Sequence, residues 1–147
     1  MIDYVIKNES CVKMGYIGSK ISADVHLMNG VTPQEFISNM KKQVADSSYI
    51  DSADICTILS GKDRAFYGKF TFTNVGKYYV IFDDVEWLKV VDVKDVCMFI
   101  EGKIDPDGIN AIMELLLGMM PDPYKINCMY SLQESEANII KINLLLA

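Results

Sequence analysis

The chain contains one histidine, His26, so nucleophilic catalysis of the Ser-His-Asp or Cys-His type would have to use it. Cys11 lies upstream in a polar stretch, where a thiol could be reactive. His26, however, falls on the polar side of residues 21–27, where apolar and polar residues alternate as in a half-buried strand. No local pattern pairs it with Cys11. We therefore predict a surface histidine and no catalytic residue.

Residues 103–114 partly match a calcium-binding loop. If Gly108 takes the sixth loop position, Asp105 and Asp107 take the third and fifth. Glu114 then falls on the twelfth position, but Lys103 stands at the first, where a carboxylate belongs. Because capping of a helix explains both aspartates, we expect no metal ion here.

The glycines and cysteines of the chain do not indicate a cofactor either. Segment 15–20 has two residues between its glycines, whereas a phosphate-binding loop needs four and then Lys before Ser or Thr. There is no C-x-x-C pair among the cysteines, and most of them lie in apolar runs. We expect four buried free thiols. They are Cys11, Cys56, Cys97 and Cys128.

An acidic cluster gives the first candidate surface for a partner. Its carboxylates could occupy a basic groove of another protein, bind a divalent cation, or belong to a solvated turn. Trp87, the only tryptophan, stands beside them as either an interface anchor or a core residue. The five acidic candidates are Asp83, Asp84, Glu86, Asp92 and Asp95.

The composition is that of a globular domain. The chain has 147 residues, a formal charge of −6 and 50% hydrophobic residues, which excludes intrinsic disorder. An acidic chain with one arginine, Arg64, is poorly suited to bind nucleic acid directly. No apolar run approaches the ~20 residues of a membrane span. The N-terminus does not match a signal peptide, so we expect a cytoplasmic protein without membrane contact.

Two helices are expected. The first, over residues 32–46, begins with a capping box formed by Thr32 and Glu35. The second, over residues 105–120, has Asp105 as its N-cap. Strands are expected at residues 1–7, 21–27, 53–59, 65–73, 77–82, 87–91, 96–101, 124–132 and 138–146. Two hairpins are expected among them, one of 65–73 with 77–82 and one of 124–132 with 138–146. Because hairpins outnumber helices, residues 1–147 are predicted to form a single α+β domain, a mainly antiparallel sheet of about six to eight strands with two helices packed on it.

Apolar residues give the second candidate surface. The second helix is apolar around most of its circumference, and the last strand ends in three leucines. Either this helix is a core element covered on both sides, or part of its surface faces a partner. The last strand, as a sheet edge, would also invite pairing with another chain. The candidate apolar contacts are Trp87, Leu117, Met120, Leu144 and Leu146.

These observations favour a non-catalytic protein-binding or assembly module. Its partner is another protein or a second copy of itself, and it acts either as a structural or accessory subunit or as an inhibitor of a host protein. A bias towards Ile, Lys, Asn and Asp suggests an AT-rich genome, such as that of a phage or mobile element, in which case the compartment is the host cytoplasm.

Two other classes of function stay open. The first is a domain that binds a small ligand, a nucleotide or metabolite, in a pocket between sheet and helix. Its lining would include aromatic strand residues, namely Phe66, Phe70, Tyr78 and Phe82. The second is a hydrolase without a recognisable motif.

Overall fold

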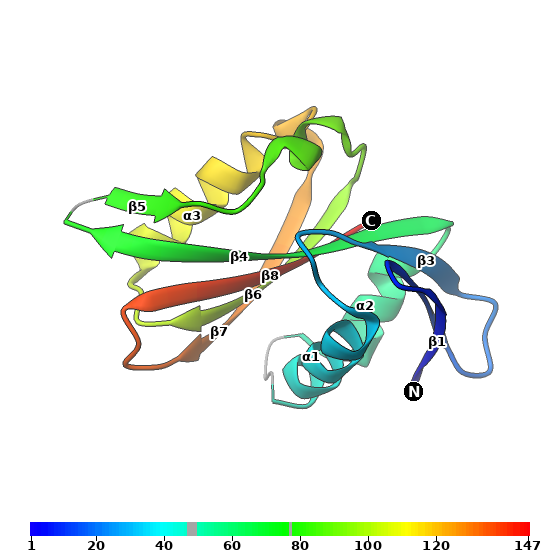
Figure 1. The fold of residues 1–147 in the computed structure, drawn as a ribbon. Coiled ribbons are helices and arrows are strands. Elements are labelled where there is room, and N and C mark those ends of the chain that lie inside the picture. Colours follow the sequence, from blue (N-terminus) through cyan, green and yellow to red (C-terminus); the bar gives the residue numbers. More distant parts are fainter. Residues whose placement is uncertain (47–49, 77) are drawn as a thin grey trace.

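The computed structural model describes residues 1–46, 50–76 and 78–147, which form an eight-stranded sheet with helices on both faces (Figure 1). The strands are β1 (Ile2–Asn8), β2 (Cys11–Tyr16), β3 (Ser22–Leu27), β4 (Arg64–Val75), β5 (Tyr78–Ile81), β6 (Asp95–Gly102), β7 (Asn127–Glu134) and β8 (Ile139–Leu146). The helices are α1 (Pro33–Asp46), α2 (Ser52–Leu59) and α3 (Pro106–Leu117), with short 3-10 helices η1 (Glu86–Val90) and η2 (Pro123–Lys125).

The sheet is mixed. Its strand order is β1-β2-β3-β4-β8-β6-β7, and β5 pairs with the distal end of β4. The pairs β3–β4 and β6–β7 are parallel, whereas the other neighbours are antiparallel. The α+β class is confirmed, but the prediction of a mainly antiparallel sheet with two helices was wrong, because the described residues form a mixed sheet and three α-helices.

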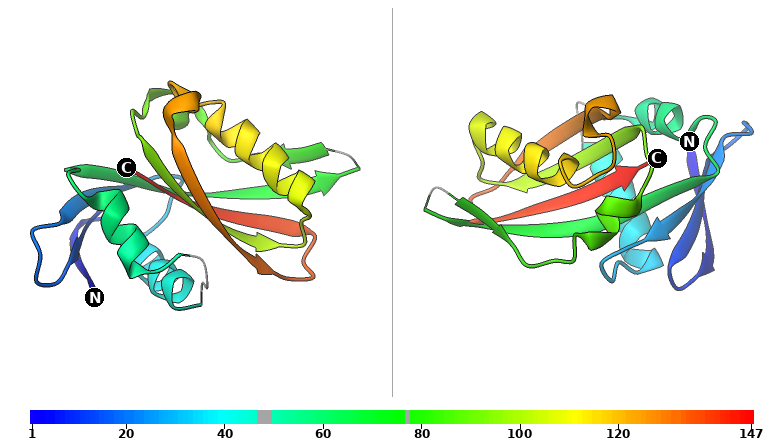
Figure 2. Two further views of the ribbon diagram at one scale, coloured as in Figure 1. Left: turned by 180° about the vertical axis from the view of Figure 1, so that it is seen from behind. Right: turned by 90° about the horizontal axis from the view of Figure 1, so that it is seen from above.

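The helices cover different halves of the two sheet faces (Figure 2). On one face, α1 and α2 pack against β2, β3 and the start of β4, in a core that contains Phe36, Ile55 and Tyr67. On the other face, α3 packs against β6, β8 and the rest of β4, in a core that contains Phe72 and Ile112. Side chains alternate along β4, so this one strand contributes to both cores. On the α1 side of the sheet, α1 lies beside the later part of β4 and the adjoining parts of β8, β6 and β7 but does not cover them.

The starts of α1 and α3 confirm Thr32 and Asp105 as capping residues, but the predicted capping box at α1 is only half formed, because the Glu35 carboxylate pairs with Lys69. Thr32 Oγ1 accepts from the Glu35 backbone N–H at 3.1 Å, as a capping residue should. Asp105 Oδ1 accepts from the Gly108 N–H at 2.7 Å, so this aspartate caps α3. The outer side of α3 is exposed at Asn110 and Glu114, so this helix is not covered on both sides.

Two predicted strands are helices. Residues 53–59 belong to α2, which begins with a capping box in which Asp51 and Asp54 each accept from the other's backbone N–H. Short apolar runs do not distinguish a strand from a buried helix, and the capping residues were the signal that we missed. Residues 87–91 overlap η1, which buries Trp87 and Leu88 against the sheet.

The last strand is central, so its prediction as a sheet edge was wrong. β8 lies between β4 and β6 and is antiparallel to both. The expected hairpin of β7 with β8 does not form, because β6 occupies the place between them. The hairpin of β4 with β5 does form, with Gly76 at a φ of +63°, while the first predicted residue of its second strand, Lys77, lies outside the described residues.

In the described part of the chain, none of the helices has the length and apolar character needed to cross a bilayer.

Candidate functional site

The acidic residues around Trp87 mainly stabilise turns. Asp83 Oδ2 accepts from the Thr71 backbone N–H at 2.7 Å, which ties the segment after β5 to β4. Asp84 Oδ1 accepts from the Glu86 N–H at 3.0 Å, and Glu86 forms an ion pair with Lys89 at 2.8 Å. Asp84 and Glu86 thus have partners within their own segment, whereas Asp83 bonds to β4.

The other two acidic candidates lie elsewhere. Asp95 forms an ion pair with Lys62 at 3.4 Å, and Asp92 is exposed. Asp95 begins β6, near the start of β4, whereas Asp83 bonds Thr71 five or more residues further along β4, a separation of ~17 Å. The five residues therefore do not form one compact surface, and no group of residues in the described part of the chain is arranged to hold a metal ion.

The apolar candidates pack inside the chain. Leu144 and Leu146 are fully buried, Met120 and Trp87 are 3% and 8% exposed, and Leu117 is partly buried against the same core. Trp87 Nε1 also donates to Asn29 Oδ1 and to the Asp84 carbonyl, each at 3.1 Å. Side chains enclosed in this way offer little area to a partner.

Cys11 and His26 lie directly opposite each other on β2 and β3, a proximity that the sequence did not reveal. The Asp24 carboxylate on the same face pairs with Lys7 at 2.9 Å rather than with the imidazole. Burial raises the pKa of the Cys11 thiol, and Asp24 raises it further. A catalytic thiol needs a lowered pKa, so this arrangement lacks an activated nucleophile.

The remaining thiols with perturbed acidity are also poor nucleophiles. Burial raises the pKa of Cys128 to about 11 and that of Cys97 well above its ordinary value. Both lie on neighbouring strands as free thiols. The prediction of four buried free thiols is confirmed for Cys11 and Cys97, whereas Cys56 and Cys128 are only partly buried.

One edge of the sheet is open along its whole length. β7 pairs with β6 alone. The Asn127 N–H donates to the Lys94 carbonyl at 2.7 Å and the Ser135 N–H to the Gly102 carbonyl at 3.3 Å. Because backbone groups alternate between the two sides of a strand, odd-numbered residues bond β6 and even-numbered residues face outward. The residues whose backbone N–H and C=O groups point away from β6 are Cys128, Tyr130, Leu132 and Glu134.

This edge lacks the features that usually prevent strands from pairing with other chains. β7 has eight residues and contains no lysine, proline or register shift. The opposite edge, β1, has Asp3, Lys7 and a register shift near its end, and β5 has only four residues. Tyr130 is 45% exposed on β7. Among the described strands, β7 thus offers the longest unprotected edge.

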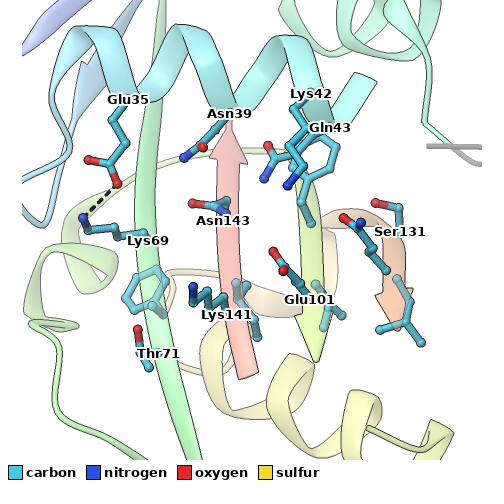
Figure 3. Close-up of a pocket in the computed structure, with 16 residues that line it drawn as sticks. Glu35, Asn39, Lys42, Gln43, Lys69, Thr71, Glu101, Ser131, Lys141 and Asn143 are labelled. Carbon is cyan, nitrogen blue, oxygen red and sulfur yellow. Dashed lines mark hydrogen bonds and ion pairs between the residues drawn. The ribbon is translucent and has the colours of Figure 1, made fainter. Parts of the chain in front are cut away.

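The second candidate feature is a polar groove between α1 and the uncovered part of the sheet, with a volume of about 490 Å³ (Figure 3). α1 forms one wall, and β4, β8, β6 and β7 form the floor. Its polar side chains are Glu35, Asn39, Lys42, Gln43, Lys69, Thr71, Glu101, Ser131, Gln133, Lys141 and Asn143.

Strand register places these polar residues in rows. Lys69 lies opposite Asn143, and Thr71 lies opposite Lys141, across β4 and β8. Lys141 lies opposite Glu101 across β8 and β6. Residues paired across strands share one face, so side chains from distant parts of the sequence meet in the groove.

The groove contains one ion pair and several groups without partners. Lys69 Nζ contacts Glu35 Oε1 at 2.9 Å and so joins the floor to α1. Lys42 and Lys141 form no ion pair with any described residue. The side chains of Gln43 and Asn39 lie within hydrogen-bonding reach of the buried Tyr67 hydroxyl.

Sequence reasoning anticipated a pocket between sheet and helix but not its lining. Of the aromatic residues expected there, only Phe70 lines the groove. Phe66 packs towards the α3 side, while Tyr78 and Phe82 are 76% and 88% exposed. The alternation of Lys69, Thr71 and the other polar residues in strands was the available signal, but it does not show which strands are neighbours.

No family model matches the sequence, and no curated protein is significantly similar to it. Among solved structures, a mutant of FtsZ from M. jannaschii has a similar fold, with a TM-score of 0.54 and 10% identity over 78% of this chain and 38% of that chain. CetZ from Methanosaeta thermophila gives a TM-score of 0.45 and 12% identity over 80% of this chain and 36% of that chain. The chain thus spans little more than a third of these proteins, and the likeness to FtsZ is one of fold alone.

Proposed function

We propose that this protein is a non-catalytic assembly module of the cytoplasm that pairs with a second copy of itself through β7. The observation that carries the proposal is the edge of β7, where the backbone groups of four residues point away from β6 and have no strand partner among the described residues. The strand contains no lysine, proline or register shift.

A second copy is a better occupant than an unrelated strand because the edge is complementary to itself. In an antiparallel pairing centred on Tyr130, Cys128 faces Leu132 of the second copy, and about six backbone hydrogen bonds form. Glu134 then faces Ile126 of the second copy, so no like charges meet. Antiparallel pairing also has the two-fold symmetry of a closed dimer.

The assembly role fits the geometry better than inhibition of a host protein, in which the carboxylates would occupy a basic groove of that protein. That role requires the carboxylates of residues 83–95 to act as one surface, and they are divided between two places on the sheet. The assembly role needs only the β7 edge. The proposal includes an origin in a phage or mobile element, and amino-acid composition alone supports that part of it.

The test is the mass in solution, measured by light scattering behind a sizing column across a range of concentrations. We expect twice the 16.6 kDa mass of one chain at high concentration. Tyr130→Pro removes an outward-facing N–H, so it should give a monomer with an unchanged circular dichroism spectrum.

Ser131→Pro is the matched control, because the Ser131 N–H faces β6 and its loss breaks the parallel ladder. This variant should lose stability, whereas Tyr130→Pro should lose association. A wild-type protein that stays monomeric at every concentration would refute the proposal. A Tyr130→Pro variant that still forms the dimer would show that the interface is not β7 and would refute the proposal equally.

A further inference from the structure

We infer that the polar groove beside α1 binds a small phosphorylated sugar or polyol. The site lies within one chain and is independent of the β7 edge as an assembly surface. Its volume of about 490 Å³ falls in the range of small-molecule sites. Lys42 projects from the α1 wall and Lys141 from the floor, and neither has an ion-pair partner among the described residues (Figure 3).

The cations favour a phosphate group. Each lysine is a compact point charge that suits a phosphate oxygen, and the groove has no arginine to grip a carboxylate with two parallel hydrogen bonds. Lys42 lies on α1 and Lys141 on β8, so the two ammonium groups enter the groove from different sides (Figure 3). Lys69, on the floor, is already paired with Glu35 of the α1 wall.

The neutral lining favours hydroxyl groups on the rest of the ligand. Amides and hydroxyls donate and accept hydrogen bonds, and six of them line the groove. They are Asn39, Gln43, Thr71, Ser131, Gln133 and Asn143.

The aromatic residues argue against a nucleotide. Phe70 and Phe99 line the groove, but they are only 1% and 4% exposed. Neither offers an open ring face on which a base could stack. A sugar or polyol needs no such face, so it fits the lining better than a nucleobase does.

Glu101 provides a variant for which the affinity should rise rather than fall. It lies opposite Lys141 across β8 and β6, and a carboxylate at this position competes with a phosphate for the same ammonium group. Glu101→Gln keeps the size of the side chain and removes its charge. This variant should bind the phosphorylated ligand more tightly, while Lys141→Gln and Lys42→Gln should each weaken binding about tenfold.

The experiment is isothermal titration calorimetry with glucose 6-phosphate and glycerol 3-phosphate, compared with glucose, inorganic phosphate and AMP. Lys94→Gln is the matched control, because Lys94 is exposed and lies before the opposite end of β6. We expect binding of the phosphorylated sugar or polyol, weaker binding of the other three, and no effect of Lys94→Gln.

Three results would overturn the inference. The first is no heat with either phosphorylated probe at millimolar concentration. The second is equal loss of affinity in Lys94→Gln and Lys141→Gln, which would indicate general charge attraction. The third is AMP or inorganic phosphate binding at least as tightly as the sugar phosphate, which would mean that the neutral lining contributes nothing to recognition.

Discussion

The contact between Gly68 and Trp87 shows how a single residue sets the packing of the α3 side. A Cβ atom at position 68 would lie 2.6 Å from Trp87 Cζ2 and 3.1 Å from Cη2. The indole cannot move away freely, because its Nε1 is bonded to Asn29 and its ring stacks on Phe70 at 5.9 Å. Glycine is therefore required on β4 beneath the ring.

Gly68→Ala should lower the free energy of unfolding by about 1–3 kcal/mol, the usual cost of overpacking a core. Urea denaturation followed by circular dichroism measures this change. In a Trp87→Phe background the same substitution should cost less, because the smaller ring leaves room for the methyl group. An equal cost in both backgrounds would show that the strain does not come from the indole.

At the scale of elements, α2 depends on its first turn. Asp51 Oδ1 accepts from the Asp54 N–H at 3.0 Å, and Asp54 Oδ2 accepts from the Asp51 N–H at 2.9 Å. The helix has only eight residues, so it gains little from propagation. Its stability comes from this capping box and from burial of Ile55 and Ile58 in the α1 side core.

Asp51→Ala should destabilise the protein by about 1 kcal/mol, because it leaves the Asp54 backbone N–H without its acceptor. Thermal and urea unfolding would both report the loss. Asp51→Asn retains an acceptor oxygen and serves as the control, with a smaller expected effect. If the two substitutions cost the same, the charge of Asp51 rather than its hydrogen bond stabilises α2.

Local signals predicted elements, whereas long-range pairing decided the site. The capping residues of α1 and α3 lie within a few positions of the turn that they cap, so Thr32 and Asp105 could be identified from sequence. The strands that neighbour β7 and β8 could not be identified from sequence. A short connection suggests a hairpin, and no local pattern reveals that β6 lies between them. The groove depends on that order, since it brings Lys141 beside Glu101.

At the scale of the whole molecule, two cores share one sheet. β4 contributes Tyr67 to the α1 side and Phe70 to the α3 side, and β8 contributes Leu145 and Leu144 in the same way. Loss of packing on one face therefore disturbs strands that the other face needs. We expect the two cores to unfold together as one cooperative unit.

Ile55→Ala tests this coupling, because Ile55 is fully buried in the α1 side core and Trp87 reports on the α3 side core. The cavity should cost about 2–5 kcal/mol. The urea midpoint measured by fluorescence of Trp87, the only tryptophan, should fall by the same amount as the midpoint measured by circular dichroism. Ile112→Ala, a matched cavity on the α3 side, should move both signals together as well. If Ile55→Ala left the tryptophan midpoint unchanged while circular dichroism fell in two steps, the two halves of the sheet would be separate folding units, and the shared strands would not couple them.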